Sequence, residues 1–385
     1  MKKQIYLDHN ATTPPFPEVV EEMTAALRDG FGNPSSVHAV GQRARRLLDR
    51  ARDQVAELLQ ADPQEIVFTS GGTEANNQVL FGALETGGRI LTSQVEHRAV
   101  LSPCEQLEKA GMAIGRLEVD AQGRVVPAAL AQAWTPETSL VSVMLANNDV
   151  GTLQPVGEIA SWVKARGGLV HTDAVQAVGK IPVRVGELGV DFLSLSGHKL
   201  GGPKGVGALF VRRAAALAPR IFGGLQERGR RAGTENVPGI VGLGKACALL
   251  QICQDEQTQR VRALRDRLQQ GLLARVPEMV VDGHPIERLP NTLHVRFADV
   301  NGEALLMNLD LLGIAVSTGS ACTAGSQDPS PVLLAMGVPG DQALGSIRFS
   351  LGWNNTAGEV EETIEAVERC ISSLRAQPVH PRVMG

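Results

Sequence analysis

Short apolar segments alternate with helix-like segments between residues 40 and 255 of this 385-residue chain, and this alternation constrains the fold most strongly. The segments are apolar on both sides of the backbone, which is typical of strands in a sheet buried on both faces. We therefore expect an α/β domain with a mostly parallel sheet. The expected strands are residues 65–70, 89–93, 140–146, 168–172, 191–196 and 206–211, and an amphipathic helix is expected at 42–60.

The pattern changes after residue 255, where a second, smaller α+β domain is expected. The chain is long enough for two domains with separate cores. We expect a large α/β domain over residues 15–255, a small domain over 256–385, and an N-terminal segment, residues 1–14, that joins the small domain. Its expected helices are 255–273, 303–312, 331–336 and 358–374, and its expected strands are 291–297 and 346–350.

Composition and charge exclude several classes of protein. The formal net charge is -4, so nothing favours binding to nucleic acid or to an anionic membrane. No apolar run reaches the roughly 18 residues that span a bilayer, and the first residues lack the apolar stretch of a signal peptide. The five cysteines are scattered without a CxxC pair, which argues against a zinc site or a disulfide framework. A reducing cytoplasm is the expected location.

A glycine pair follows the expected strand at 65–70, in the segment Gly71-Gly72-Thr73-Glu74. Glycines let the backbone approach an anion, and the helix that follows presents free N–H groups there. The segment therefore predicts a phosphate site at Gly72 and Thr73. An ordinary turn with Thr73 as the helix cap explains the same residues and stays open at this point.

Two charged residues follow two other expected strands. Asp173 comes after residues 168–172, and Lys199 comes after residues 191–196. The carboxyl ends of parallel strands are where ligands bind in open α/β sheets. A carboxylate there can pair with a protonated pyridine nitrogen, and a lysine can form a Schiff base. The alternatives are an aspartate that caps a helix and a surface lysine.

A lone cysteine, Cys322, lies in a run of small polar residues, STGSACTAGS, at 317–326. Free cysteine is usually a small buried residue. The composition around Cys322 instead favours a mobile loop, so a reactive thiol is expected. The other four cysteines are expected to be structural.

Many ordered segments together resemble one enzyme family. They are YLDHNATTP at 6–14, FGNPSS at 31–36, TSGGTEANN at 69–77, EHRAV at 96–100, NNDVG at 147–151, HTDAVQ at 171–176, SLSGHKLGGPKGVGAL at 194–209, GGLQERGRRAGTENVP at 223–238, STGSACTAG at 317–325 and SIRFSLG at 346–352. The chain resembles the cysteine desulfurases of the NifS/IscS type. These are fold-type I enzymes that depend on pyridoxal 5'-phosphate (PLP).

The resemblance implies a role for each matching residue around the cofactor. Lys199 would hold PLP covalently and move the substrate's Cα proton. Asp173 would pair with the pyridine nitrogen, Gln176 would hydrogen-bond the ring oxygen, and His97 would stack on the ring. The residues implied at the phosphate are Gly72, Thr73, Ser196 and His198, with Thr234 reaching the phosphate of the other subunit. A homodimer with shared sites is thus implied.

The resemblance also implies the substrate and the reaction. Asn148 and Arg348 would hold the carboxylate of L-cysteine. Cys322 would take its sulfur as a persulfide, and the rest of the substrate would leave as alanine. Because a free thiol near pKa 8.5 is only roughly a few per cent thiolate at neutral pH, some activation is needed, and His97 is the candidate for proton handling.

Several questions stay open at the level of sequence. Asp149 replaces a glutamate that is usual in the family, and His9 is an uncommon residue in its segment. Few residues follow Leu374, which leans toward a NifS-like member and leaves the acceptor open between an iron–sulfur scaffold and another protein. The rival activities are selenocysteine lyase or cysteine-sulfinate desulfinase, and, in a different class, a PLP aminotransferase. A scaffold without chemistry would be expected to lose Lys199, Asp173 or Cys322, and all three are present.

Overall fold

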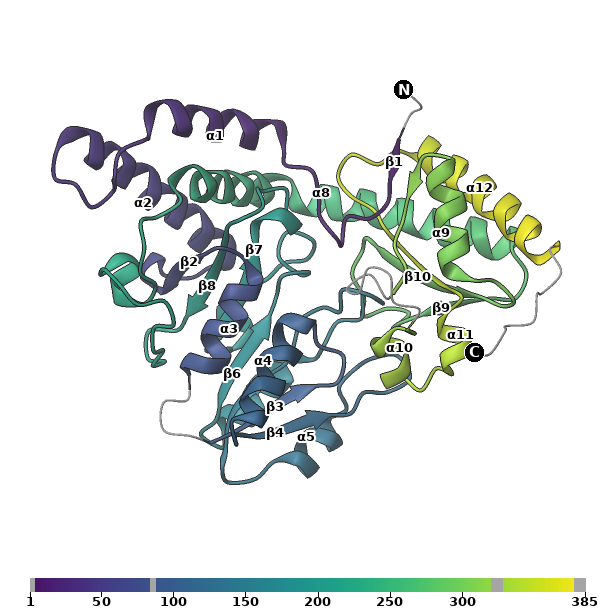
Figure 1. Ribbon diagram of the computed structural model, residues 1–385, viewed down its shortest axis with the longest axis horizontal. Coiled ribbons are helices and arrows are strands. Elements are labelled where there is room, and N and C mark those ends of the chain that lie inside the picture. The colour runs from purple at the N-terminus through teal and green to yellow at the C-terminus, as the bar shows by residue number, and fades with distance from the viewer. Residues whose placement is uncertain (1–3, 84–87, 320–327, 377–385) are drawn as a thin grey trace.

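A seven-stranded sheet forms the centre of the larger part of the molecule (Figure 1). The structure is a computed structural model and describes residues 4–83, 88–319 and 328–376. Within the sheet only β8 runs against its neighbours, so the expected mostly parallel sheet is confirmed. In spatial order the strands are β2 (Ile66–Thr69), β8 (Gly207–Val211), β7 (Phe192–Ser196), β6 (Leu169–Asp173), β5 (Thr138–Ser142), β3 (Arg89–Ser93) and β4 (Ala113–Leu117).

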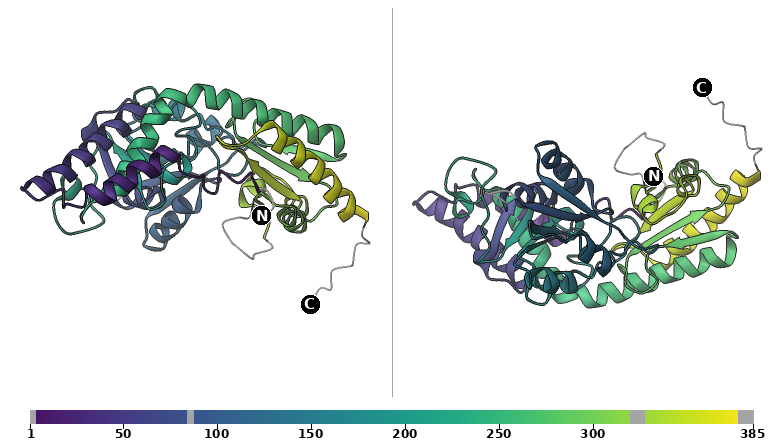
Figure 2. Two further views of the ribbon diagram at one scale, coloured as in Figure 1. Left: turned by 90° about the horizontal axis from the view of Figure 1, so that it is seen from above. Right: turned by 90° about the horizontal axis from the view of Figure 1, so that it is seen from below.

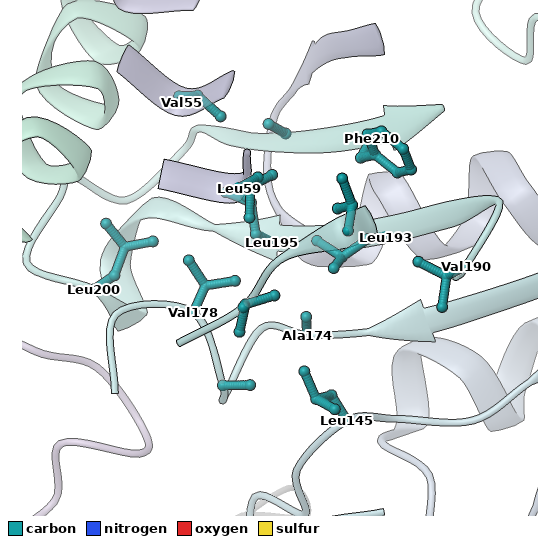
Figure 3. Packing of buried hydrophobic residues seen from close by; sticks show 14 of the residues in the cluster. Val55, Leu59, Leu145, Ala174, Val178, Val190, Leu193, Leu195, Leu200 and Phe210 are labelled. Atoms are coloured by element: carbon teal, nitrogen blue, oxygen red, sulfur yellow. The ribbon is translucent and has the colours of Figure 1, made fainter. Parts of the chain in front are cut away.

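Helices bury both faces of this sheet, which explains the apolar strands. Side chains alternate between the faces along a strand. Leu193 and Phe210 point into one core, and their neighbours Phe192 and Leu209 point into the other. Figure 3 shows Leu193, Leu195 and Phe210 packed with residues of α2. The first core contains α2 (Ala39–Leu59), α6 (Val156–Lys164) and part of α8 (Val237–Arg275), and the second contains α3 (Gly72–Gly82) and α4 (Arg98–Lys109).

The remaining helices of this part are short or peripheral. α1 (Pro17–Asp29) packs on α8, beside α2 (Figure 1). α5 (Pro127–Ala133) follows β4, and α7 (Val185–Leu188) is a single turn before β7.

The smaller part has its own sheet and its own apolar core. Three antiparallel strands, β12 (Ser346–Ser350), β10 (Thr292–Phe297) and β9 (Met279–Asp282), lie in that order. Beside them β1 (Ile5–Tyr6) pairs in parallel with β11 (Ile314–Ala315), so the start of the chain lies against its last third. The helices are α9 (Gly302–Leu311), α10 (Pro331–Ala335), α11 (Gly340–Ala343) and α12 (Ala357–Ala376).

One helix differs clearly from the expectation. The helix expected at 255–273 is the second half of α8, which runs for 39 residues and contacts α1 and α2 as well as α12 (Figure 2). The polar stretch after residue 250 marks where α8 leaves the larger core, because glutamine and glutamate are good helix formers and do not end a helix. One 18-residue window of α8 has a mean hydropathy of 1.3, high enough for a membrane span, but 56% of it is buried inside the protein.

The strand expected at 140–146 is also shorter than predicted and ends at Ser142. Residues 143–146 are buried beyond its end, where the N–H of Met144 donates to the side chain of Glu96 at 2.8 Å. Val143 and Leu145 still donate their N–H groups to the carbonyls of His171 and Asp173 in β6, at 3.1 and 2.9 Å, so composition overestimated only the length of the regular strand.

Candidate active site

A cavity of about 210 Å³ opens at the carboxyl ends of β6 and β7, beside the start of α3. Since a water molecule occupies about 30 Å³ in the liquid, the cavity has room for a small organic molecule. Its polar lining residues are Gly72, Thr73, Asn76, His97, Asn148, Asp173, Gln176, Ser196, His198 and Lys199. The structure thus brings together nine of the residues expected at the site, from segments far apart in the chain.

One end of the cavity is suited to an anion. Helix α3 begins after Gly71, and no side chain caps its free N–H groups. Gly71 has φ +155° and ψ -178°, a backbone conformation that is essentially restricted to glycine. A Cβ on Gly72 would lie 2.5 Å from Cγ2 of Val175. Gly71 is therefore required by its backbone conformation and Gly72 by the close approach of the Val175 side chain. The helix dipole favours negative charge at this point.

A buried carboxylate lies at the end of β6. Asp173 is 5% exposed, and its oxygens accept hydrogen bonds from the N–H of Val175 at 2.9 Å and from Nδ2 of Asn76 at 2.6 Å. A carboxylate offers about four lone-pair sites, so two donors leave room for a further N–H donor. Asp173 can therefore pair with a protonated ring nitrogen in the cavity.

Lys199 lies in a single 3₁₀ turn, Gly197–Lys199, directly after β7. Its Nζ donates to the carbonyl oxygens of Asn10 and of Ala11, the latter at 2.7 Å. The Asn10 carbonyl also accepts from Nε2 of Gln176 at 2.9 Å. The N-terminal segment thus holds both side chains at the cavity.

The two histidines that line the cavity are held in their uncharged form. His97 caps α4, because its Nδ1 accepts from the N–H of Ala99 at 3.1 Å. Burial lowers its pKa, although the charge of Asp173 acts in the opposite direction. Burial and then the charge of Lys199 lower the pKa of His198 to about 4. At neutral pH the ring of His97 therefore carries its proton on Nε2.

Arg348 lies on β12 and does not line the cavity directly. Its guanidinium donates to the backbone carbonyl of Asn148 at 3.0 Å and forms an ion pair with Asp8 at 2.7 Å. Its Nε is buried without a hydrogen-bond partner among the described residues. A carboxylate arriving here would therefore share Arg348 with Asp8.

Comparisons with known proteins agree on one family. Residues 5–363 match the family model described as aminotransferase class-V. A cysteine desulfurase IscS from Dictyoglomus turgidum is 48% identical over 379 residues, which cover 97% of this chain and 96% of that protein. The chain belongs to the cysteine desulfurases of the class-V aminotransferase family.

Solved structures support the same fold for this cysteine desulfurase. A NifS-like protein is similar with a TM-score of 0.91 and 39% sequence identity, over 96% of this chain and 100% of that one. A structure of SspA in complex with cysteine has a TM-score of 0.80 and 34% identity, over 92% of this chain and 100% of that one. The expected PLP-transferase fold of type I is therefore confirmed.

Cysteine desulfurases depend on PLP, and the groups around the cavity fit that cofactor. Uncapped N–H groups at α3 suit a phosphate, the Asp173 carboxylate suits a pyridinium N–H, and the Lys199 amine suits the aldehyde. When bound, PLP supplies an electron sink for the carbanion that forms at the substrate's Cα.

Besides Arg348, one expected site residue that the structure describes does not line the cavity. Thr234 is exposed in the loop before α8 and does not line the cavity of its own chain. Cys322 lies outside the described residues. Asp149, which replaces the usual glutamate, is buried and accepts from Oγ of Ser330 at 2.7 Å.

Sequence reasoning missed several residues that position the site. Asp8 and Asn10 lie in the segment YLDHNATTP, which was assigned to the family but to no role. Asn76 and Glu96 likewise lie inside recognised motifs. The local signal was their presence in those motifs, and only their partners across the fold reveal what they contact.

Proposed function

We propose that this desulfurase takes sulfur from L-cysteine in the cavity between Asp173 and Lys199 and passes it to Cys322. The observation that supports this most strongly is the convergence of a lysine amine, a buried carboxylate and an uncapped helix start on one cavity. Each of these groups has an ordinary structural explanation alone, but together they match the three polar parts of PLP.

The cofactor-holding roles are assigned to the residues that line the cavity. Lys199 binds the aldehyde carbon, Asp173 pairs with the ring nitrogen, Gln176 donates to the ring oxygen, and His97 lies against the ring face. The neutral state of His97 suits such stacking because an uncharged ring loses little solvation on burial. The phosphate is assigned to Gly72, Thr73, Ser196 and His198.

The chemistry assigned to the chain's own groups is proton transfer and sulfur transfer. Asn148 and Arg348 hold the substrate carboxylate, with a two-point contact from the arginine. Lys199 Nζ takes the proton from Cα. The thiolate of Cys322 then attacks the substrate sulfur, so that an S–S bond forms while the C–S bond breaks and its electrons stay on carbon. That carbon, Cβ, takes up one proton, Cα takes back the proton held by Lys199, and the product leaves as alanine.

His97 is proposed to handle the thiol proton. Its Nδ1 is occupied by the cap of α4, so Nε2 is the nitrogen that remains for exchange with another group. In the neutral ring Nε2 already carries a proton, so the ring can take up the thiol proton only at Nδ1, after Nδ1 gives up its contact with the N–H of Ala99.

The decisive experiment measures alanine and sulfide released from L-cysteine in the presence of a thiol reductant. Wild-type protein should release the two in equal amounts, and Cys322→Ser should lose both. Cys253→Ser is the matched control, because Cys253 is a free, partly exposed cysteine that does not line the cavity. Turnover that survives in Cys322→Ser would instead indicate a selenocysteine-lyase, sulfinate-desulfinase or aminotransferase type of reaction.

We also propose a homodimer in which Thr234 completes the phosphate site of the partner. Large apolar side chains are exposed on two loops, residues 30–38 and 212–236, and residues from both loops line one pocket. Phe31, Val37, Phe222 and Leu225 are between 76% and 91% exposed. Apolar surface of this kind marks an interaction site, and a second copy is the partner to which the assignment of Thr234 points.

The persulfide is proposed to serve an iron–sulfur scaffold or another sulfur-accepting protein in the cytoplasm. Support for a reducing compartment comes from the four described cysteines, which are all free. Transfer of labelled sulfur from the loaded enzyme to purified candidate acceptors would identify the partner.

A further inference from the structure

Behind Gln176 lies a polar cluster that joins the N-terminal segment to both sheets. Lys180 lies four residues after Gln176 in the chain. Its Nζ donates to Oε1 of Gln176 at 2.5 Å and to Oδ1 of Asn10 at 2.9 Å. Lys180 does not line the proposed cofactor cavity.

Four hydrogen bonds fix the orientation of the side-chain amide of Asn10. Its Oδ1 accepts from Lys180 and from Nδ2 of Asn291 at 3.0 Å. Its Nδ2 donates to the carbonyl of Asn148 at 3.1 Å and to Oγ1 of Thr292 at 2.9 Å. Because Asn10 is only 2% exposed, these bonds hold its backbone carbonyl in place as well.

The Gln176 amide is constrained from two directions. Its Oε1 faces the Lys180 amine, and its Nε2 donates to the Asn10 carbonyl at 2.9 Å. A flipped amide would place two donors together and two acceptors together, which buried polar groups do not tolerate cheaply. An amide nitrogen has two hydrogens, so one N–H of Gln176 remains for the cavity that this residue lines.

We propose that Lys180 is a positioning residue that makes Gln176 donate an N–H to the ring oxygen of the cofactor. The proposal rests on the role assigned to Gln176 above. Without Lys180, the buried Oε1 loses its donor, and the amide keeps only the Asn10 carbonyl to orient it.

The charge of Lys180 does not decide this role. Burial lowers its pKa well below the usual value, and the charges of Lys199 and Arg348 lower it further. Lys180 in turn lowers the pKa of His9 and of His198. Among the described residues it has no carboxylate partner within 4 Å. An ammonium and a neutral amine both have enough hydrogens to donate to the two amide oxygens.

A measurable consequence follows for the bound cofactor. A donated N–H stabilises the anionic form of the ring oxygen, and this lowers the pH at which the conjugated ring system gives up its proton. The visible absorption of the holoenzyme reports that titration without any turnover. Lys180→Met should therefore raise the midpoint of the spectral pH titration by about one pH unit.

The test compares wild type, Lys180→Met, Gln176→Leu and the double variant as holoenzymes of equal cofactor content. If Lys180 acts through Gln176, both single variants shift the midpoint upward and the double variant matches Gln176→Leu. Lys109→Met, at an exposed position on α4, is the matched control and should keep the wild-type midpoint. Circular dichroism confirms that each variant is folded.

Three results would overturn the inference. A shift in Gln176→Leu without one in Lys180→Met removes the role of Lys180 and leaves the assignment of Gln176 intact. A shift in Lys180→Met alone, or additive shifts in the double variant, show that Lys180 acts by another route. No shift in Gln176→Leu refutes the proposed contact of Gln176 itself.

Discussion

At the scale of single residues, burial shifts the pKa values of two sequence neighbours beside the site, Glu96 and His97, in opposite directions. Burial raises the pKa of Glu96 to about 8 and lowers that of His97, so both are held uncharged near neutral pH. Glu96 accepts from Oγ of Ser93 at 2.6 Å and from the N–H of Met144, and its second oxygen has no partner among the described residues. An uncharged Glu96 places no second negative charge beside Asp173.

This state of Glu96 predicts a pH dependence of stability. Between its ordinary pKa and about 8, the folded protein holds a proton that the unfolded chain has lost, so the free energy of unfolding falls as pH rises. The fall is at most about 1.4 kcal/mol per pH unit for one group. Glu96→Gln cannot titrate and should show a flatter dependence by up to that amount. Urea unfolding of the holoenzyme at pH 6 and pH 8 measures the difference.

The control for Glu96 is a glutamate in solvent. Glu57→Gln changes the same side chain at an exposed position of α2 and should keep the wild-type slope. An equal slope for Glu96→Gln and wild type would mean that Glu96 is ionised in the folded protein.

At the scale of elements, a buried ion pair fastens the loop before α8 to helix α2. Arg52 donates to both oxygens of Glu227, at 2.8 and 2.6 Å, and to the carbonyl of Ile66 at 2.7 Å. Glu227 also accepts from the N–H of Phe68. Glu227 and Arg228 have φ values of +46° and +58°, a strained region for residues other than glycine, so the surrounding bonds must hold this turn in place.

Breaking this pair should be costly. Arg52→Met leaves the carboxylate of Glu227 buried without its cation, and we expect a loss of about 3–5 kcal/mol in the free energy of unfolding. Arg52→Met combined with Glu227→Gln should recover part of that loss, because no charge is then buried. Chemical denaturation of both variants measures the effect.

An exposed arginine on the same helix provides the comparison. Arg45 pairs with Asp49 one turn away in solvent, and Arg45→Met should cost at most about 0.5 kcal/mol. A similar small cost for Arg52→Met would show that the pair with Glu227 does not hold the loop.

At the scale of the whole molecule, α8 runs from the larger apolar core to the smaller one (Figure 1). The site lies at the carboxyl ends of β6 and β7, where the N-terminal segment contacts Lys199. Its first half packs on α1 and α2, and its second half on α12. The exposed apolar loops lie on the larger part, away from the small three-stranded sheet. This arrangement leaves a surface on the large part for a second copy.

The proposed dimer predicts the effect of charge on that surface. Phe222→Asp together with Leu225→Asp places two carboxylates in an apolar contact, so the mass measured by light scattering should fall from dimer to monomer. Cofactor content should fall as well if Thr234 completes the partner's phosphate site. Ile286→Asp, at a 79% exposed residue outside these loops, should leave the mass unchanged. A monomeric wild type would refute the dimer.

Much of the fold was predictable because local composition records burial. Strands β3, β7 and β8 lie within one residue of their expected bounds, since an apolar run buried on two faces has no other simple explanation. Strand β4 was not predicted because its residues are partly exposed at the edge of the sheet. Only the second half of α8 was predicted, because the polar residues in its middle resemble a boundary between domains. The hydropathy of a residue reflects whether its side chain is buried, and only indirectly which backbone conformation it adopts.

For the site, sequence by itself determined the residue types and the motifs that carry the chemistry: the glycine turn at Gly72, the aspartate after β6 and the lysine after β7. Tertiary structure alone decided what these residues contact. Arg348 pairs with Asp8 across 340 positions, and Lys180 reaches Asn10 across 170. Local composition encodes which groups must be buried, but the direction of a hydrogen bond between distant groups exists only once the chain has folded and excluded water from them.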